Sequence, residues 1–365
     1  MIGKLVLENL KHRPMRSLLS ILLIGVPVTL ILSLVGLTQG MLRDSQRRQQ
    51  GIGADIILRA STASSVISFT GAAIPAKVVD LIDKLPHVKL AMGVLTHSID
   101  PPLVMSGVDF DRFNRMNGGF EYLRGGPIRN PGEILIDKPY ATQKGVSVGG
   151  VIRLLNREWR VAGIIGPGKL TRIAVPLDVL QDLDGYSNKV SQVFVKVDRP
   201  SDIAAVMQEL HETLPNYTVN SMEEWIAAFS VQNIPGIREF TVVIIVIGVV
   251  IGFSVVCLSM YMAVLQRTRE IGILKSLGAS KGFILAIILV EAELLGVGGT
   301  ILGILFSFGA YWLIQTLVPA SIPMIIVPTW WPIAGFITLV GTGLGALYPG
   351  LTAAAHDPIE ALAYE

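Results

Sequence analysis

The run Gly163–Lys169 (Gly-Ile-Ile-Gly-Pro-Gly-Lys) has residue types and a spacing that could hold a nucleotide phosphate. It fits the first seven positions of a P-loop, in which backbone N–H groups and a lysine bind phosphate. The eighth position of that motif must be Ser or Thr to hold Mg²⁺, and here it is Leu170. Pro167 also removes an N–H from the run. We therefore predict a glycine-rich turn after a strand, and no cofactor on this chain.

Hydrolytic and metal-dependent chemistry has no better support in the residue spacing. The histidines between residues 41 and 237 do not follow the HxxEH or HExxH spacing of zinc hydrolases, and no GxSxG elbow occurs. The single cysteine, Cys257, lies in an apolar stretch, so the sequence predicts neither a disulfide nor a thiolate metal site. We predict no catalytic and no metal-binding residues. The residues considered and set aside are His87, His97, His211, Asp109, Asp111, Asp182 and Asp184.

Long stretches without charge dominate the rest of the sequence. Leu18–Thr38, Phe240–Leu265 and residues 294–355 contain no Asp, Glu, Lys or Arg. Because about 20 apolar residues cross the hydrocarbon of a bilayer, these stretches predict membrane helices. Prolines between residues 319 and 332 divide the last stretch into two spans. With 16% charged residues and a net charge of +2, the composition excludes a nucleic-acid partner.

The predicted fold is a polytopic α-helical membrane protein with four spans and an α+β extracytoplasmic domain between spans 1 and 2. Strands rich in Val and Ile, such as those expected at Glu133–Ile136 and Gln192–Val197, alternate with short helices in that domain. Residues 117–132 are an exposed loop or a subdomain boundary. The predicted segments are a cytoplasmic amphipathic helix at 1–17, span 1 at 18–40, the α+β domain at 41–237, span 2 at 238–265, a cytoplasmic coupling helix at 266–290, span 3 at 291–318, an extracytoplasmic loop at 319–330, span 4 at 331–355 and a cytoplasmic tail at 356–365.

Basic residues predict the orientation of the spans. Residues 1–17 and residues 266–281 each carry four Lys or Arg, whereas the loop at 319–330 carries none. Cytoplasmic loops carry the excess of positive charge, so we expect both termini in the cytoplasm and the α+β domain outside.

Small residues and a carboxylate predict how the later spans pack. Gly299 and Gly303, and likewise Gly341 and Gly345, are four residues apart, which lets helix backbones approach within the chain or between two copies. Glu291 opens the third span near its cytoplasmic end. An interfacial carboxylate paired with the basic loop is the favoured interpretation of Glu291, and an ion relay is the alternative.

The segment 266–281 (Gln-Arg-Thr-Arg-Glu-Ile-Gly-Ile-Leu-Lys-Ser-Leu-Gly-Ala-Ser-Lys) is the most specific local feature. Ile271, Leu274, Leu277 and Gly278 fall on one helical face, and the charged residues of the segment point elsewhere. Such a helix lies on lipid headgroups, or it is the contact through which a soluble partner acts on the spans.

This segment, followed by Glu291 and a glycine-rich span, resembles the FtsX-like/MacB permease family. The start of the chain, Asn9–Leu19, and its end, Ala353–Leu362, resemble the same family. The resemblance covers nearly the whole chain, although the α+β domain matches mainly in layout. The size of that domain is nearer to MacB or the lipoprotein-releasing LolC/LolE type than to FtsX proper.

The resemblance implies a permease subunit of an ABC transporter that works by mechanotransmission in the bacterial cytoplasmic (inner) membrane. In that family two permeases, two copies or two paralogues, pair with a cytoplasmic ATPase dimer that holds ATP and Mg²⁺. A periplasmic adaptor or a lipoprotein and membrane lipid are further implied partners, and the substrate is a lipid, lipoprotein, peptide or drug. The residues implied to contact the ATPase are Arg267, Arg269, Glu270, Ile271, Leu274, Lys275, Asp357 and Pro358.

Two other functions remain open at this point. The same machine could regulate an extracytoplasmic partner such as a cell-wall hydrolase. The chain could instead be a membrane-anchored receptor or an enzyme that needs no ATPase.

Overall fold

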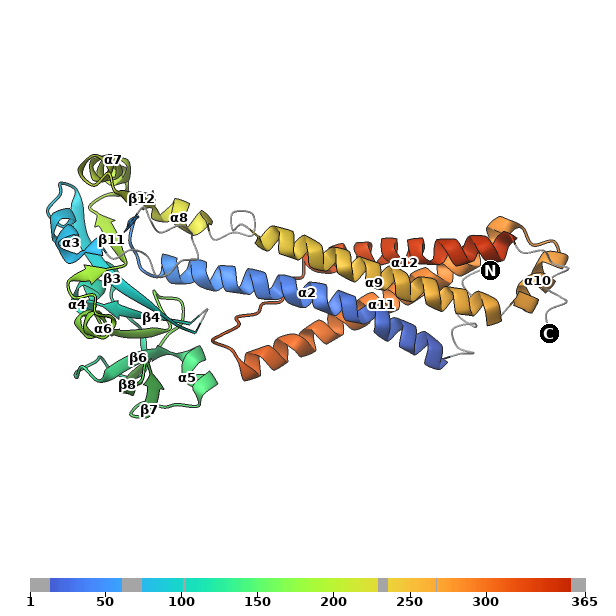
Figure 1. The fold of residues 1–365 in the computed structure, drawn as a ribbon, viewed down its shortest axis with the longest axis horizontal. Helices are drawn as coiled ribbons and strands as arrows, with labels where there is room; N and C mark the ends of the chain where they lie inside the picture. The colour runs from blue at the N-terminus through green and yellow to red at the C-terminus, as the bar shows by residue number, and fades with distance from the viewer. Residues whose placement is uncertain (1–13, 61–73, 101–102, 229–235, 267, 356–365) are drawn as a thin grey trace. The chain divides into compact units, whose positions relative to one another are not determined.

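The computed structural model describes residues 14–60, 74–100, 103–228, 236–266 and 268–355 (Figure 1). The chain forms two compact units. The helical unit comprises Met1–Thr38, Gly236–Leu313 and Met324–Glu365, and the α+β unit comprises Gln39–Pro235 and Ile314–Pro323. The α+β unit is therefore inserted between the first and second long helices, as the fold prediction required.

Within the described ranges, four helices are long and apolar enough to cross a membrane. Together with the short helix α10, the helices of this part of the chain are α2 (Pro14–Gln50), α9 (Ile237–Gln266), α10 (Thr268–Ser276), α11 (Lys281–Leu317) and α12 (Trp330–Ala355). α2 continues ten residues past the predicted end of span 1 at residue 40. Residues 41–50 contain no Gly or Pro, and the helix ends only at Gly51, two residues before Gly53 with its positive φ of 76°. At 37 residues, α2 is about 55 Å long.

The boundary between α10 and α11 differs from the predicted one. The sequence suggested one coupling helix at 266–290 and a third span from residue 291, whereas α11 already begins at Lys281. Gly278, with φ +92°, ends α10, because glycine adopts this left-handed conformation at little cost. The Ser280 side chain then accepts a hydrogen bond from the Phe283 backbone N–H at 3.2 Å, which caps the start of α11.

The core of the helical unit lies where α9, α11 and α12 meet near α10. Buried residues of this core include Val256, Ile288, Ala292 and Ala346, and Ile24 of α2 joins them. Because α9, α11 and α12 have small or β-branched residues at these positions, their backbones pack closely. Figure 1 shows α9 and α12 side by side along their length.

The α+β unit is built from short elements around one large sheet. Its strands are β1 (Ile56–Ala60), β2 (Ile74–Pro75), β3 (Val88–Asp100), β4 (Leu103–Val108), β5 (Tyr122–Gly125), β6 (Glu133–Asp137), β7 (Val151–Leu154), β8 (Arg157–Ile165), β9 (Ile173–Pro176), β10 (Lys189–Val190), β11 (Gln192–Val197) and β12 (Tyr217–Ser221). Its helices are α3 (Ala76–Ile82), α4 (Phe110–Asn117), α5 (Lys138–Lys144), α6 (Leu177–Asp184), the 3-10 helix η1 (Pro200–Asp202), α7 (Ile203–Thr213) and α8 (Met222–Ala228).

The sheet order is β12-β1-β11-β3-β4-β9-β6-β8-β5, with β7 paired to β8. The pairs β4–β9 and β6–β8 are parallel, and the other pairs in this sheet are antiparallel. Residues 117–132 do not separate two subdomains, because the sheet runs continuously from β4 through β9 and β6 to β8 and β5. This segment instead ends α4 at Gly118 and then forms β5.

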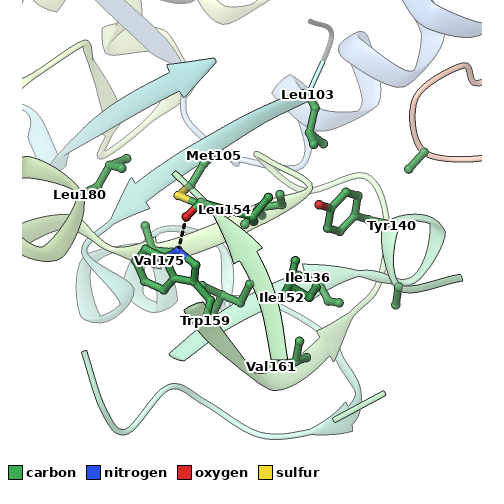
Figure 2. Packing of buried hydrophobic residues seen from close by; sticks show 14 of the residues in the cluster. Leu103, Met105, Ile136, Tyr140, Ile152, Leu154, Trp159, Val161, Val175 and Leu180 are labelled. Carbon is green, nitrogen blue, oxygen red and sulfur yellow. Dashed lines mark hydrogen bonds between the residues drawn. The ribbon is translucent and has the colours of Figure 1, made fainter. Parts of the chain in front are cut away.

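Two hydrophobic cores lie along this sheet. One packs α3 and α7 against β1, β11 and β12, and the other packs α5 and α6 against β4, β6, β8 and β9. Figure 2 shows the second core, in which the fully buried Trp159 indole N–H donates to the Leu154 carbonyl at 3.1 Å. Tyr140 of α5 is 1% exposed in the same core. The buried face of α5 thus fixes this short helix on the sheet.

Candidate functional site

The first candidate region is α10, the helix of the predicted coupling segment. It covers a small cavity of about 100 Å³ at the start of α11. The cavity wall brings together four residues of the predicted sites, Glu270, Ile271, Leu274 and Glu291, with apolar residues of α9 and α11. Glu291 is 5% exposed, and the structure therefore places this carboxylate inside the helical unit.

The two faces of α10 differ in what they contact. Ile271 and Leu274 pack inward against the core of the helical unit. Glu270, Ile273 and Leu277 are exposed, and Leu277 is 80% exposed. Residues 270, 273 and 277 share one helical face, since positions three and four apart are neighbours on a helix. α10 thus packs on the spans with one face, while Glu270, Ile273 and Leu277, which directly follows the helix, are exposed on the other.

Lys275 ties α10 to the last span. Its Nζ donates to the backbone carbonyl of Ala354 at 3.0 Å, near the C-terminal end of α12. A cation is favourable there because the last carbonyls of a helix lack intrahelical partners and carry partial negative charge. This predicted ATPase-contact residue therefore makes an internal contact. Arg267, the Arg269 side chain, Asp357 and Pro358 lie outside the described part of the structure.

The glycines predicted at span interfaces lie at contacts within the chain. A Cβ on Gly299 would meet Ile24 of α2 at 2.5 Å, and one on Gly303 would meet Val28 at 2.6 Å. The Thr29 hydroxyl also donates to the Gly303 carbonyl at 3.2 Å. Between α12 and α9, a Cβ on Gly345 would meet the Phe253 carbonyl of α9 at 2.8 Å.

Gly341 is less crowded than the other three glycines. The nearest atoms to a Cβ at this position belong to Val249 of α9, at 4.0 Å. Glycine is therefore sterically required at Gly299, Gly303 and Gly345, where a side chain would force the helices apart.

The second candidate region lies in the α+β unit, where the end of α2 meets the sheet. Asp44 and Arg48 of α2 form a closed ring of ion pairs with Asp137 at the end of β6 and Arg172 before β9. The four N···O distances are 3.0 Å (Arg48–Asp44), 2.9 Å (Arg48–Asp137), 2.7 Å (Arg172–Asp44) and 3.2 Å (Arg172–Asp137). We call these four residues the charge ring.

The charge ring is buried and locally neutral. Asp137 is 0% exposed, and Arg48 and Arg172 are each 8% exposed. Burial opposes the Arg48 charge, but Asp44 and Asp137 outweigh it and raise the pKa of Arg48 above its usual value. Burial and the neighbouring Arg48 lower the pKa of Arg172. Both guanidinium groups nevertheless stay charged at neutral pH, because arginine does not lose its proton in proteins.

Asp137 also caps α5, and α5 in turn binds the loop that follows α11. Its other carboxylate oxygen accepts the Tyr140 N–H at 2.9 Å, which satisfies a free donor at the start of α5. One turn later, Gln143 Oε1 accepts the backbone N–H groups of Ala320 and Ser321 at 2.9 and 3.1 Å. Gln143 Nε2 also donates to Ser321 Oγ at 2.8 Å. α5 thus contacts both the end of α2 and the loop that follows α11.

The motifs set aside in the sequence have structural contacts. The Gly163–Lys169 run is the end of β8 and a turn, in which Lys169 Nζ donates to the Gly119 carbonyl. His97 contacts Asp184 at 2.9 Å, and Asp109 caps α4 through the Arg112 N–H. Among the described residues, no cluster of three or more His, Cys, Asp or Glu could hold a metal ion.

Sequence reasoning missed the charge ring, Gln143 and the exposed Ile273. It placed Leu277 on one apolar face with Ile271 and Leu274, whereas Leu277 is 80% exposed and the other two pack inward. Only Asp44 and Arg48 carried a local signal, since they are four residues apart on one helix. The other partners are distant in sequence, and Arg48 and Asp137 are 89 residues apart.

Comparisons with known proteins cover both units. The MacB-like periplasmic core domain model matches residues 17–213, and the FtsX-like permease C-terminal model matches residues 242–358. The chain is 35% identical over 213 residues to the uncharacterized ABC transporter permease YknZ of Bacillus subtilis, covering 54% of this chain and 50% of YknZ. It is 29% identical over 242 residues to the macrolide export ATP-binding/permease protein MacB of Bdellovibrio bacteriovorus, covering 60% and 36%.

A solved structure of the extracellular domain of YknZ is also similar, with a TM-score of 0.36 and 16% identity, covering 45% of this chain and 98% of that one. The chain spans about half the length of the curated relatives it matches. The periplasmic core model alone matches more than half of the 365 residues. The chain therefore belongs to the ABC transporter permeases of the MacB and FtsX-like type.

Proposed function

We propose that this chain is a permease subunit that passes motion from a cytoplasmic ABC ATPase dimer to the α+β unit, and so exports or extracts a substrate. The observation that carries the proposal is the division of α10 into two faces. Ile271, Leu274 and Lys275 hold α10 on the spans, which leaves Glu270, Ile273 and Leu277 to contact the ATPase. ATP and Mg²⁺ are bound by the ATPase, on a separate chain.

In this proposal α2 and the loop after α11 carry the motion to the α+β unit. Both end in contacts to α5, through the charge ring and through Gln143. Buried ion pairs that are also hydrogen-bonded resist separation, because parting them leaves charges without partners. A displacement of α2 along its axis therefore pulls on β6 and α5.

The assembly we propose has two permeases, copies or paralogues, in a bacterial inner membrane. Both termini lie in the cytoplasm and the α+β unit lies outside, where an adaptor or lipoprotein can meet it. The macrolide export named for the relative MacB supports an exported small molecule, and lipid, lipoprotein and peptide belong to the same range of substrates.

The test uses the full chain with its ABC ATPase in lipid nanodiscs. The double variant Ile273→Ala/Leu277→Ala should weaken the complex by roughly thirtyfold, since two interface anchors are worth about 1 kcal/mol each or more. ATPase activity that depends on the permease should fall in parallel. The matched control is Leu305→Ala/Leu313→Ala, which truncates two exposed leucines of α11 and should leave coupling unchanged. Full coupling in the α10 variant, and in Arg269→Ala/Glu270→Ala, would refute this function for α10.

A further inference from the structure

A groove beside α5 in the α+β unit has no part in the proposed function. It has a volume of about 460 Å³, within the usual range of ligand sites. Leu123 and Arg124 of β5, Lys138 of α5 and the half-buried Val146 line it, together with the core residue Ile164, which is 6% exposed. The groove thus combines two cations with aliphatic side chains.

The two cations of the groove lack the carboxylate partners that some other basic residues of this unit have. Arg124 and Lys138 are both exposed, and within the described chain neither makes an ion pair. Arg112, in contrast, lies within 3.7 Å of the carboxylates of Asp80, Asp83 and Asp109. The groove therefore has uncompensated positive charge, which is complementary to an acidic ligand.

Strand β5 adds the backbone N–H and C=O groups of a sheet edge to the positive charge of the groove. It is the last strand in the sheet order, and β8 is its one neighbour among the described strands. All four residues of β5 are exposed, and Leu123 is 45% exposed. An edge strand of this kind offers free N–H and C=O groups to a further strand, so it favours an extended peptide over a lipid tail.

We propose that this groove binds an extended segment of an extracytoplasmic protein in which acidic and apolar residues alternate. The segment adds to the edge of β5, its carboxylates meet Arg124 and Lys138, and its apolar side chains lie on Leu123 and Val146. The proposal rests on the proposed function for the outside location of the α+β unit. α5, which carries Lys138, is the helix that the charge ring caps, so this ligand touches the element that receives the motion of α2.

The experiment measures fluorescence anisotropy of a labelled peptide, Asp-Val-Glu-Val-Asp-Val-Glu-Val, with the full chain in phosphatidylcholine nanodiscs. We expect saturable binding that weakens as salt increases. Arg124→Gln/Lys138→Gln should weaken it by roughly tenfold, as expected for two exposed ion pairs. The control Lys77→Gln/Lys84→Gln removes two exposed cations outside the groove and should bind like the unaltered chain.

Two further peptides distinguish strand addition from electrostatic attraction alone. A peptide with lysine at the acidic positions, and an acidic peptide N-methylated at alternate residues, should both lose binding. Equal binding of the N-methylated peptide would overturn strand addition, and equal loss in the control variant would overturn the site. Binding of phosphatidylglycerol vesicles that requires Arg124 and Lys138 while the peptide fails to bind would assign the groove to lipid instead.

These readouts need no ATPase. If the peptide fails to bind while ATPase coupling is intact, the groove proposal alone is refuted. If the peptide binds but ATPase coupling does not depend on α10, the proposed function alone is refuted.

Discussion

Replacing Asp137 with asparagine removes one negative charge from the charge ring and leaves the side-chain shape nearly unchanged. Asp137 is fully buried and accepts from Arg48 at 2.9 Å and from Arg172 at 3.2 Å. In the variant both guanidinium groups share Asp44, so a buried positive charge is left without a partner. Removing one partner of a buried pair costs about 3–5 kcal/mol. That is a large part of the 5–15 kcal/mol that typically stabilises a protein.

The burial and hydrogen bonds of each carboxylate determine the free-energy cost that we expect for the comparison variants. Asparagine still offers an oxygen to the Tyr140 N–H, so Asp137→Asn keeps the cap of α5, whereas Asp137→Ala should lose a further ~1 kcal/mol. The Asp44 side chain is 25% exposed, so water reaches this carboxylate and screens its ion pairs more than those of the fully buried Asp137. Asp44→Asn should therefore cost only on the order of 1 kcal/mol.

Hydrogen exchange of the full chain in nanodiscs measures these costs. The free energy of opening for amides of β6 and α5 should fall by the amounts given, and the surface control Asp182→Asn should change it by less than about 0.5 kcal/mol. A cost for Asp137→Asn no larger than that of Asp44→Asn would refute the reasoning, because burial would then add nothing to the ion pairs.

Three further outcomes are expected. Gly299→Ala places a Cβ 2.5 Å from Ile24 and should destabilise the helical unit by about 1–3 kcal/mol in thermal melting, whereas Gly309→Ala, with nothing within 4 Å, should not. Gln143→Ala removes three hydrogen bonds and should speed hydrogen exchange of Ala320 and Ser321. Hydrogen bonds from the Arg129 backbone N–H and the Asn130 side chain lower the pKa of Glu133. Ionised Glu133 therefore stabilises the fold at pH values above the ordinary carboxyl pKa, and this stabilisation is lost as the pH falls through the lowered pKa. Glu133→Gln should thus reduce stability near neutral pH and match the unaltered chain in acid, measured by urea unfolding at a series of pH values.

Each of these has a result that would contradict it. Equal melting of the two glycine variants would mean that α2 does not pack on α11 as described. Unchanged exchange at Ala320 would mean that the loop is held without Gln143. A stability difference for Glu133→Gln that persists in acid would exclude ionisation as its cause.

The spans and the alternation of strands and helices could be predicted because their signals are local. A stretch such as Phe240–Leu265 indicates a membrane helix by itself, since the cost of placing charge in hydrocarbon depends on each residue in turn. The strands expected at Glu133–Ile136 and Gln192–Val197 lie within one residue of β6 and β11. The family resemblance rested on the equally local segment 266–281.

Other features depended on contacts that periodicity does not record. Ile271 and Leu274 were expected to face an ATPase, but α10 turns them toward the spans, because a helix with apolar residues on more than one face can bury only one of them. The long strand β3 went unpredicted, since its residues Val88–Asp100 acquire strand structure by pairing with β4 and β11.

The sequence by itself determined that four apolar helices flank an α+β domain and that the chain belongs among these permeases. Only the tertiary structure decided that Asp44, Arg48, Asp137 and Arg172 form one ring and that the outward face of α10 consists of Glu270, Ile273 and Leu277. The reason is physical: apolar length acts on each segment independently, whereas the pairing of buried charges needs segments up to 128 residues apart to meet with matched geometry.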